Sequence, residues 1–167
     1  MENIIIENAR ILPGSFRNFA GRASQYNAEG DRNFVLALDQ DMAHELQNKG
    51  WPVKWTPDRY SDDGEMRATM RVKLKYTTRD GRKLVAPKVV VISSTGKVNY
   101  DESMVGLLDT MDIAKADLIL NPYEYKAMGR EGVTAYLKTA YITMAEDALD
   151  IKYRSVDGDP VSEDTPW

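Results

Sequence analysis

The segment Met66–Tyr76 alternates strictly between apolar and polar residues, and this pattern constrains the fold more than any other part of the chain. Its sequence is MRATMRVKLKY, so every even position is apolar and every odd position is polar. Alternation over eleven residues is typical of a β-strand that buries one face. The residues of the other face are Arg67, Thr69, Arg71, Lys73 and Lys75.

This cationic face has two interpretations. Alternate residues of a strand lie about 6.5 to 7 Å apart, which is on the order of the phosphate spacing in an extended nucleic-acid strand. The strand would then form the floor of a groove that binds a polyanion. Charged residues on a strand also keep a protein soluble and prevent edge-to-edge pairing, so the rest of the sequence has to decide between the two.

The composition excludes several classes of protein. With 167 residues, 43% of them hydrophobic and 29% charged, the chain is long enough for one domain with a substantial core. It has no cysteine, and its only histidine is His44. Disulfides, thiolate metal sites and histidine-based catalytic triads are therefore excluded, and we expect neither metal nor cofactor. The absence of a signal segment and of any apolar run of about 18 residues predicts neither classical export nor a membrane span.

Charge is distributed unevenly along the chain. The net charge is −4, which by itself argues against a nucleic-acid partner. Between Met66 and Ile92, however, Asp80 is the only acidic residue, whereas residues 155–167 contain acidic residues and no basic ones. The basic residues of the middle segment are Arg67, Arg71, Lys73, Lys75, Arg79, Arg82, Lys83 and Lys88.

The N-terminal third interleaves aromatic and basic residues. Two strand-like pieces, at 16–21 and 32–38, flank a turn-rich segment, which predicts a hairpin. Aromatic rings on a sheet can stack unpaired bases, and guanidinium groups can stack as well. We expect Phe34 to lie in the core, while the pattern leaves open whether the other rings are buried or exposed. The residues concerned are Phe16, Arg17, Phe19, Arg22, Tyr26, Arg32 and Phe34.

The remaining segments predict a small antiparallel barrel or sandwich with added helices. Asp39 can cap a short helix over 39–50. An Asp-Gly turn within 77–83 predicts a hairpin that joins the basic strand to a return strand over 84–93. Further strands are expected at 3–12, 51–57, 116–128 and 133–144, and short helices at 101–114 and 146–153. No alternation of strands with crossover helices is present, which argues against a parallel sheet.

The chain ends in Glu163, Asp164, Thr165, Pro166 and Trp167. An acidic run that ends in an aromatic residue is a suitable ligand for a basic pocket with a hydrophobic hole on a partner protein. The same tail could also fold back on the basic strand and compete with a nucleic acid.

In several segments the sequence resembles phage-encoded single-stranded DNA-binding proteins with an oligonucleotide-binding (OB) barrel. The resemblance covers most of residues 3–145. It rests on Phe16-Arg17-Asn18-Phe19, Gly21, Tyr26-Asn27, Gly30, Arg32-Asn33-Phe34, Val105-Gly106-Leu107-Leu108-Asp109, Asn121-Pro122-Tyr123 and Ala135-Tyr136-Leu137-Lys138-Thr139.

The resemblance implies a mainly β fold with short helices. An OB-fold-like antiparallel barrel would occupy residues 1–153, and a flexible acidic tail residues 154–167. It implies a non-enzymatic protein that coats single-stranded DNA without sequence preference in DNA replication, recombination or repair. The protein would act in the cytoplasm of a bacterial host and recruit replication or recombination proteins through Glu163, Asp164, Pro166 and Trp167. A homo-oligomer is compatible with this reading.

On this hypothesis the DNA-binding residues are of two kinds. Cations neutralise phosphates and release counterions, and aromatic rings stack bases. The cations are Arg67, Arg71, Lys73 and Lys75, helped by Arg17, Arg22 and Arg32; the rings are Phe16, Phe19, Tyr26 and Tyr136. No catalytic or metal-binding residue is predicted.

Two other classes of function compete with this reading. The acids of the loop at 58–65 could form a metal-dependent nuclease site, although four acids in a polar loop are usually solvated. A protein-interaction or virion structural module would instead use the tyrosine-rich last hairpin as a protein interface, where tyrosine is enriched. Its tyrosines are Tyr123, Tyr125, Tyr136 and Tyr141.

Overall fold

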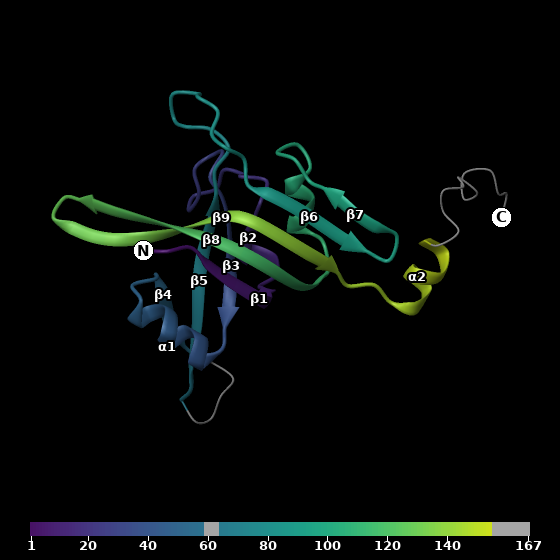
Figure 1. Ribbon diagram of the computed structural model, residues 1–167, viewed down its shortest axis with the longest axis horizontal. Helices are drawn as coiled ribbons and strands as arrows, with labels where there is room; N and C mark the ends of the chain where they lie inside the picture. The colour runs from purple at the N-terminus through teal and green to yellow at the C-terminus, as the bar shows by residue number, and fades with distance from the viewer. Residues whose placement is uncertain (59–63, 155–167) are drawn as a thin grey trace.

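The strands of the chain belong to one sheet that closes into a barrel (Figure 1). The structure is a computed structural model, and it describes residues 1–58 and 64–154. The elements are, in chain order, β1 (Ile4–Ile11), the 3₁₀ helix η1 (Gly14–Phe16), β2 (Arg17–Asn18), β3 (Arg32–Leu38), α1 (Gln40–Asn48), β4 (Val53–Pro57), β5 (Met66–Leu74), β6 (Lys88–Ser93), β7 (Gly96–Asn99), the 3₁₀ helix η2 (Val105–Asp109), β8 (Ile113–Ala127), β9 (Arg130–Met144) and α2 (Ala148–Arg154).

Five strands form the barrel. β1 pairs with β3, β3 with β5, β5 with β9, β9 with β8, and β8 returns to β1. All of these pairs are antiparallel except β5 and β9, which meet in a short parallel contact. A small five-stranded barrel of this kind is the architecture of the OB fold. The prediction of a mainly β, OB-like barrel with short helices is therefore confirmed.

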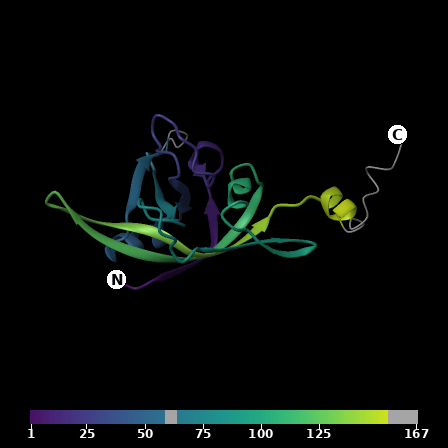
Figure 2. The same ribbon diagram turned by 90° about the horizontal axis from the view of Figure 1, so that it is seen from above.

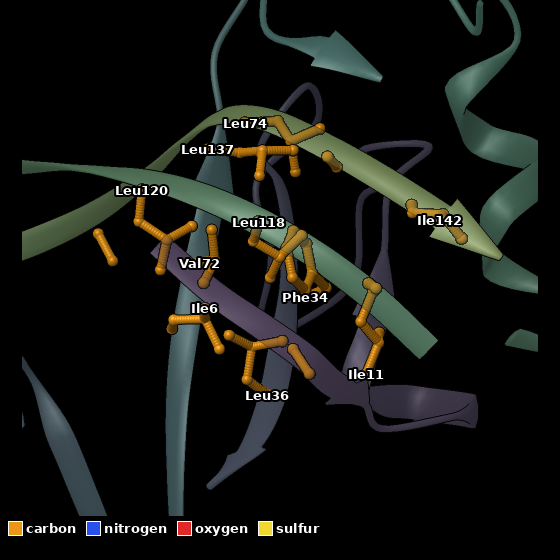
Figure 3. Close-up of a cluster of buried hydrophobic side chains, with 14 of the residues drawn as sticks. Ile6, Ile11, Phe34, Leu36, Val72, Leu74, Leu118, Leu120, Leu137 and Ile142 are labelled. Atoms are coloured by element: carbon orange, nitrogen blue, oxygen red, sulfur yellow. The ribbon is translucent and has the colours of Figure 1, made fainter. Parts of the chain in front are cut away.

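The barrel interior is filled by the apolar face of each strand (Figure 3). Phe34 and Leu36 of β3, Val72 of β5 and Leu118 and Leu120 of β8 are almost completely buried. Burial of one such side chain stabilises the fold by roughly 1.5–3 kcal/mol. Because these residues point inward, the alternate residues of the same strands face outward.

The basic strand forms as predicted, but its partner differs from the prediction. β5 alternates between exposed cations and buried apolar residues, and its regular pairing ends at Leu74, two residues before the predicted end. The Asp80-Gly81 turn closes a short antiparallel hairpin, in which Thr77 bridges to Lys83 and the Leu84 amide donates to the Tyr76 carbonyl at 2.9 Å, but this pairing does not continue into β5 and β6. Instead, β6 pairs with β9 in parallel and with β7 in antiparallel orientation. The turn of the predicted hairpin is therefore present, but the predicted pairing of the return strand with the basic strand was wrong, because a local turn signal cannot reveal that β6 pairs with residues far away in the sequence.

The N-terminal hairpin is also shorter than predicted. Gly14–Phe16 forms a 3₁₀ turn, and only Arg17 and Asn18 pair with β3. The helix prediction after β3 is confirmed, since α1 begins after Asp39, whose carboxylate accepts a hydrogen bond of 2.7 Å from the Met42 amide.

Several elements extend beyond the barrel. β4 adds to the free edge of β5, and α1 lies beside them. The long β8–β9 hairpin projects from one side of the barrel, and α2 lies apart from the barrel at the other side (Figure 2). In the described part of the chain, no helix combines the length and apolar character needed to cross a membrane. The predicted acidic tail with Glu163, Asp164, Pro166 and Trp167 lies outside the described residues.

Candidate nucleic-acid interface

A groove of about 600 Å³ lies over the outward face of β3 and β5. Asn33 and Lys73 are register partners there, one residue removed from the buried pair Phe34 and Val72. The loop between β2 and β3 forms one wall, and Tyr136 of β9 lies at the other side, next to Lys73. The groove is lined by Tyr26, Asn27, Glu29, Gly30, Asp31, Arg32, Asn33, Arg71, Lys73, Leu74, Lys75, Tyr76, Thr77, Thr78, Arg79, Glu102 and Tyr136.

A chain of hydrogen bonds fixes the wall of the groove to its floor. The Asn33 side-chain amide donates to the Asn27 side-chain oxygen at 3.0 Å, and the Arg71 guanidinium donates to the Asn33 side-chain oxygen at 2.7 Å. Asn27 in turn holds its own loop by donating to the carbonyls of Arg22 and Asp31. Arg71 is exposed but oriented, so its remaining donors point from a fixed position on the floor.

Arg32 lies at one end of the groove and is already engaged. Its guanidinium donates to the Phe19 carbonyl at 2.6 Å, lies 3.8 Å from the Glu102 carboxylate and sits over the ring of Tyr76. Burial raises the pKa of Tyr76, an effect that the positive charge of Arg32 opposes. Arg32 therefore shapes the groove more than it offers free charge.

The floor carries the net charge of the groove. Five basic and three acidic residues line the groove, so the groove has a net positive charge although the chain has a net negative charge. Lys73 and Lys75 are exposed and form no ion pair with any described residue. Phosphate groups would therefore meet two free ammonium groups and the oriented guanidinium of Arg71.

The tyrosines Tyr26 and Tyr136 line the groove. Tyr26 is 89% exposed at the tip of the β2–β3 loop. Tyr136 is half-buried and packs edge-on against Tyr123, with ring centres 6.1 Å apart. Burial raises the pKa of Tyr136, as do the nearby Tyr123 and Asp31. Both rings lie within the groove and can stack on bases.

The structure contradicts the prediction for Arg17. Its side chain is buried, and its guanidinium donates hydrogen bonds to four backbone carbonyls. Burial lowers the pKa of Arg17, whereas Asp109 and Asp112 act in the opposite direction. The accepting carbonyls belong to Ile11, Leu12, Leu108 and Met111. Arg17 is thus a structural residue that closes the end of the barrel.

The prediction for Phe19 was wrong for a similar reason. Phe19 is completely buried and stacks on Phe34, with ring centres 4.8 Å apart, so no base can reach it. The Asp109 carboxylate accepts hydrogen bonds from the amides of Phe19 and Ala20 and holds this turn in place. The sequence motif with Phe19 and the sequence motif with Asp109 therefore contact each other and stabilise the same turn.

Three other predicted residues lie outside the groove. Phe16 is half-exposed on η1, and Arg22 is exposed in the following loop, but neither lines the groove. Arg67 lies six residues before Lys73 on β5 and forms an ion pair of 3.5 Å with Asp58. The groove thus brings together Tyr26, Arg32, Arg71, Lys73, Lys75 and Tyr136 from the predicted set.

Sequence reasoning missed the two asparagines that orient Arg71. Asn33 lies inside a strand, where asparagine is disfavoured, and this local conflict was the available signal. Tyr76 was missed as a groove residue because its parity assigns it to the core; it is buried, yet it contributes to the end wall of the groove. Among the described residues, no group of three or more metal-binding side chains lies close enough together to hold an ion.

Comparison with solved structures places this barrel beside those of phage proteins. The "Single-stranded DNA-binding protein from bacteriophage Enc34, C-terminal truncation" superposes with a TM-score of 0.53 at 9% identity, over 87% of each chain. The same bacteriophage Enc34 protein "in complex with ssDNA" gives a TM-score of 0.52 at 8% identity, over 87% of this chain and 88% of that one. At this identity the similarity concerns the fold alone.

The family model supplies the sequence relationship that the structural comparison cannot. No curated protein matches the sequence. The model described as "Putative phage ssDNA-binding domain", however, matches residues 1–164, which is nearly the whole chain. The chain therefore belongs to this family of phage single-stranded DNA-binding domains.

Proposed function

We propose that this protein binds single-stranded DNA in the groove over β3 and β5 and coats it without sequence preference. The single observation that carries the proposal is that cations without an ion-pair partner among the described residues and the rings of Tyr26 and Tyr136 line the same groove on this face of the barrel. In OB folds, the face of the second and third barrel strands and the adjoining loops bind oligonucleotides. β3 and β5 are the second and third barrel strands here.

The chemistry of the groove accounts for both affinity and lack of sequence preference. Arg71, Lys73 and Lys75 neutralise phosphates and release their counterions. Tyr26 and Tyr136 stack bases, each worth roughly 1–3 kcal/mol. Every base has a ring face and every nucleotide has a phosphate, so neither kind of contact distinguishes one base from another.

A duplex is a poorer ligand for the same groove. Its bases are already stacked on one another, so Tyr26 and Tyr136 have no free ring face to contact. No helix with a basic face is available to enter a major groove either, among the helices that the structure describes. The protein should therefore prefer single strands to duplexes.

We further propose that the protein is not an enzyme and that it serves phage DNA replication, recombination or repair in the host cytoplasm. Its acidic end, with Glu163, Asp164, Pro166 and Trp167, would recruit other proteins to the coated strand. Removal of these last residues should spare or tighten DNA binding and abolish the partner contact. Weaker DNA binding after truncation would contradict this role.

The groove assignment is tested by fluorescence anisotropy with a labelled thymine oligonucleotide and an unlabelled duplex competitor. The oligonucleotide has about 30 nucleotides, which exceeds the roughly 4–16 nucleotides that one OB fold covers. We expect tight binding that duplex competes for poorly. Arg71→Ala with Lys73→Ala should weaken it at least tenfold. A matched control, Lys49→Ala with Lys126→Ala, removes the same charge outside the groove and should change affinity little. Equal losses in both variants would reject the groove.

A further inference from the structure

The outer face of β9 continues beyond the groove and carries a second group of cations around an aromatic ring. The Lys88 ammonium lies 5.4 Å from the ring centre of Tyr141. Lys97 lies on the same face as Tyr141. It is the register partner of Ile92, which is also the register partner of Thr143, and Thr143 is two residues after Tyr141 on β9. Lys88 and Lys97 are exposed, and none of the groove residues belongs to this group.

A bulge in β9 places this group on the same face as the groove. Tyr136 and Tyr141 are five residues apart, so strict alternation would put them on opposite faces of the sheet. The register shifts opposite Ile119 and Leu120, where Leu120 pairs with Leu137 and Ile119 with Thr139. This shift leaves Lys138 without a register partner. Bulges of this kind re-aim side chains.

The burial pattern agrees with this placement. Leu137 and Ala140 both point into the core although they are three residues apart, so the residues next to them, Tyr136 and Tyr141, both face outward. On β8 their register partners are Asn121 and Asp117. Four residues of strand separate those partners, which corresponds to about 13 Å.

The second group also lies directly in line with the groove. β5 and β6 line the same edge of β9 one after the other, with Lys73 beside Tyr136 and Lys88 beside Thr139. Lys88 lowers the pKa of the Tyr141 hydroxyl through a hydrogen bond and its charge, and the charge of Lys97 acts in the same direction. The register partner of Tyr141 on β8, Asp117, accepts a hydrogen bond from the Asn8 amide.

We propose that Lys88, Lys97 and Tyr141 form a second contact site for the same DNA strand, which leaves the groove past Tyr136 and runs along β9. This inference rests on the proposed function of the groove. Lys88 and Lys97 contact phosphates, and Tyr141 stacks a base. The additional length of about 13 Å extends the bound segment by a few nucleotides, within the span of roughly 4–16 nucleotides that one OB fold covers.

The test compares a short and a long thymine oligonucleotide, of about 8 and about 30 nucleotides, against the full-length protein. The proposal requires that the short one is held by the groove alone and that the long one reaches both sites. Tyr141→Ala should weaken binding of the long oligonucleotide at least about fivefold, the lower limit for loss of one stacked base. Lys88→Gln removes a phosphate contact and should weaken this binding and reduce its salt dependence. Both variants should leave binding of the short one within about twofold.

Two further variants separate the contact from general effects. Tyr141→Phe retains the ring and should bind the long oligonucleotide like the wild type. Lys126→Gln removes the same charge as Lys88→Gln from the hairpin, where Lys126 pairs with Glu131 at 3.0 Å, and should change neither affinity. Unchanged melting temperatures would show that the variants are folded.

The outcomes distinguish the two proposals. Equal affinity of wild type and variants for the long oligonucleotide overturns the second site while the groove stands. Loss for both lengths also overturns it, because the residues would then act on the groove. Failure of the wild type to bind the short oligonucleotide at low salt would instead reject the groove itself, and Tyr141 would be better explained as part of a protein interface.

Discussion

Arg17 and Arg71 show that the same residue type serves opposite purposes in this barrel. Both are arginines in segments that interleave charge with apolar residues. Arg17 gives its donors to backbone carbonyls in the interior, whereas Arg71 remains exposed and is only oriented, through Asn33. Local sequence alone cannot distinguish them, because the carbonyls that bind Arg17 come partly from η2, about ninety residues away.

Replacement of Arg17 should therefore affect stability. Arg17→Met leaves several carbonyls at the end of the barrel without donors, and an unsatisfied buried group costs about 1–3 kcal/mol. We expect the free energy of unfolding, measured by urea titration, to fall by about 3 kcal/mol. Arg10→Met, an exposed position on β1, should change it by less than about 0.5 kcal/mol. A loss at Arg17 as small as that at Arg10 would mean that its hydrogen bonds are dispensable.

Phe19 and Tyr26 form a second contrast between a buried and an exposed aromatic residue. Phe19→Ala removes a completely buried ring and should lower the free energy of unfolding by about 3–5 kcal/mol. Tyr26→Ala should leave stability nearly unchanged and weaken DNA binding by about 1–3 kcal/mol. Chemical denaturation and anisotropy, applied to both variants, separate the two roles. A stable Phe19→Ala protein that binds DNA poorly would reverse this assignment.

At the level of the elements, the sequence predicted what depends on local periodicity. The alternation of β5 and the cap of α1 are both present, because each is a short-range pattern. The pairing of β6 with β9 and the bulge at Lys138 were not predictable, since both depend on residues that meet only after the barrel closes. The presence of a cationic groove could be predicted from the alternation of β5. The β2–β3 loop that forms its wall could be identified only from the folded structure.

The β2–β3 loop offers a test at this scale. Gly21 has a φ of +68°, and a Cβ atom there would lie 3.1 Å from the backbone of Gly30. Gly21→Ala should lower stability by more than the roughly 1–2 kcal/mol of left-handed strain, and displacement of the loop that carries Tyr26 should weaken DNA binding. Gly14→Ala is the matched control, because Gly14 has a similar φ of +67° but no atom beyond its chain neighbours lies within 4 Å of a Cβ atom added there. Equal effects at both glycines would show that the contact with Gly30 is unimportant.

For the whole molecule, net charge is a poor guide to the partner. The chain carries a charge of −4, yet the outward face of β5 is cationic and the acidic end of the sequence lies far from it along the chain. A polyanion responds to the local field within about 8 to 10 Å, the screening length near physiological salt. The arrangement of charge on the barrel therefore matters more than its sum.

The most direct test of the central claim is the salt dependence of binding. The logarithm of the affinity for a thymine oligonucleotide should fall linearly with the logarithm of the salt concentration, by about 0.7 for each phosphate contact to a single strand. Contacts from Arg71, Lys73 and Lys75 predict a slope of about −2 or steeper. Arg71→Ala with Lys73→Ala removes two of these contacts and should reduce the magnitude of the slope by about 1.4. An unchanged slope in this double variant would contradict the claim that the groove over β3 and β5 binds the phosphates.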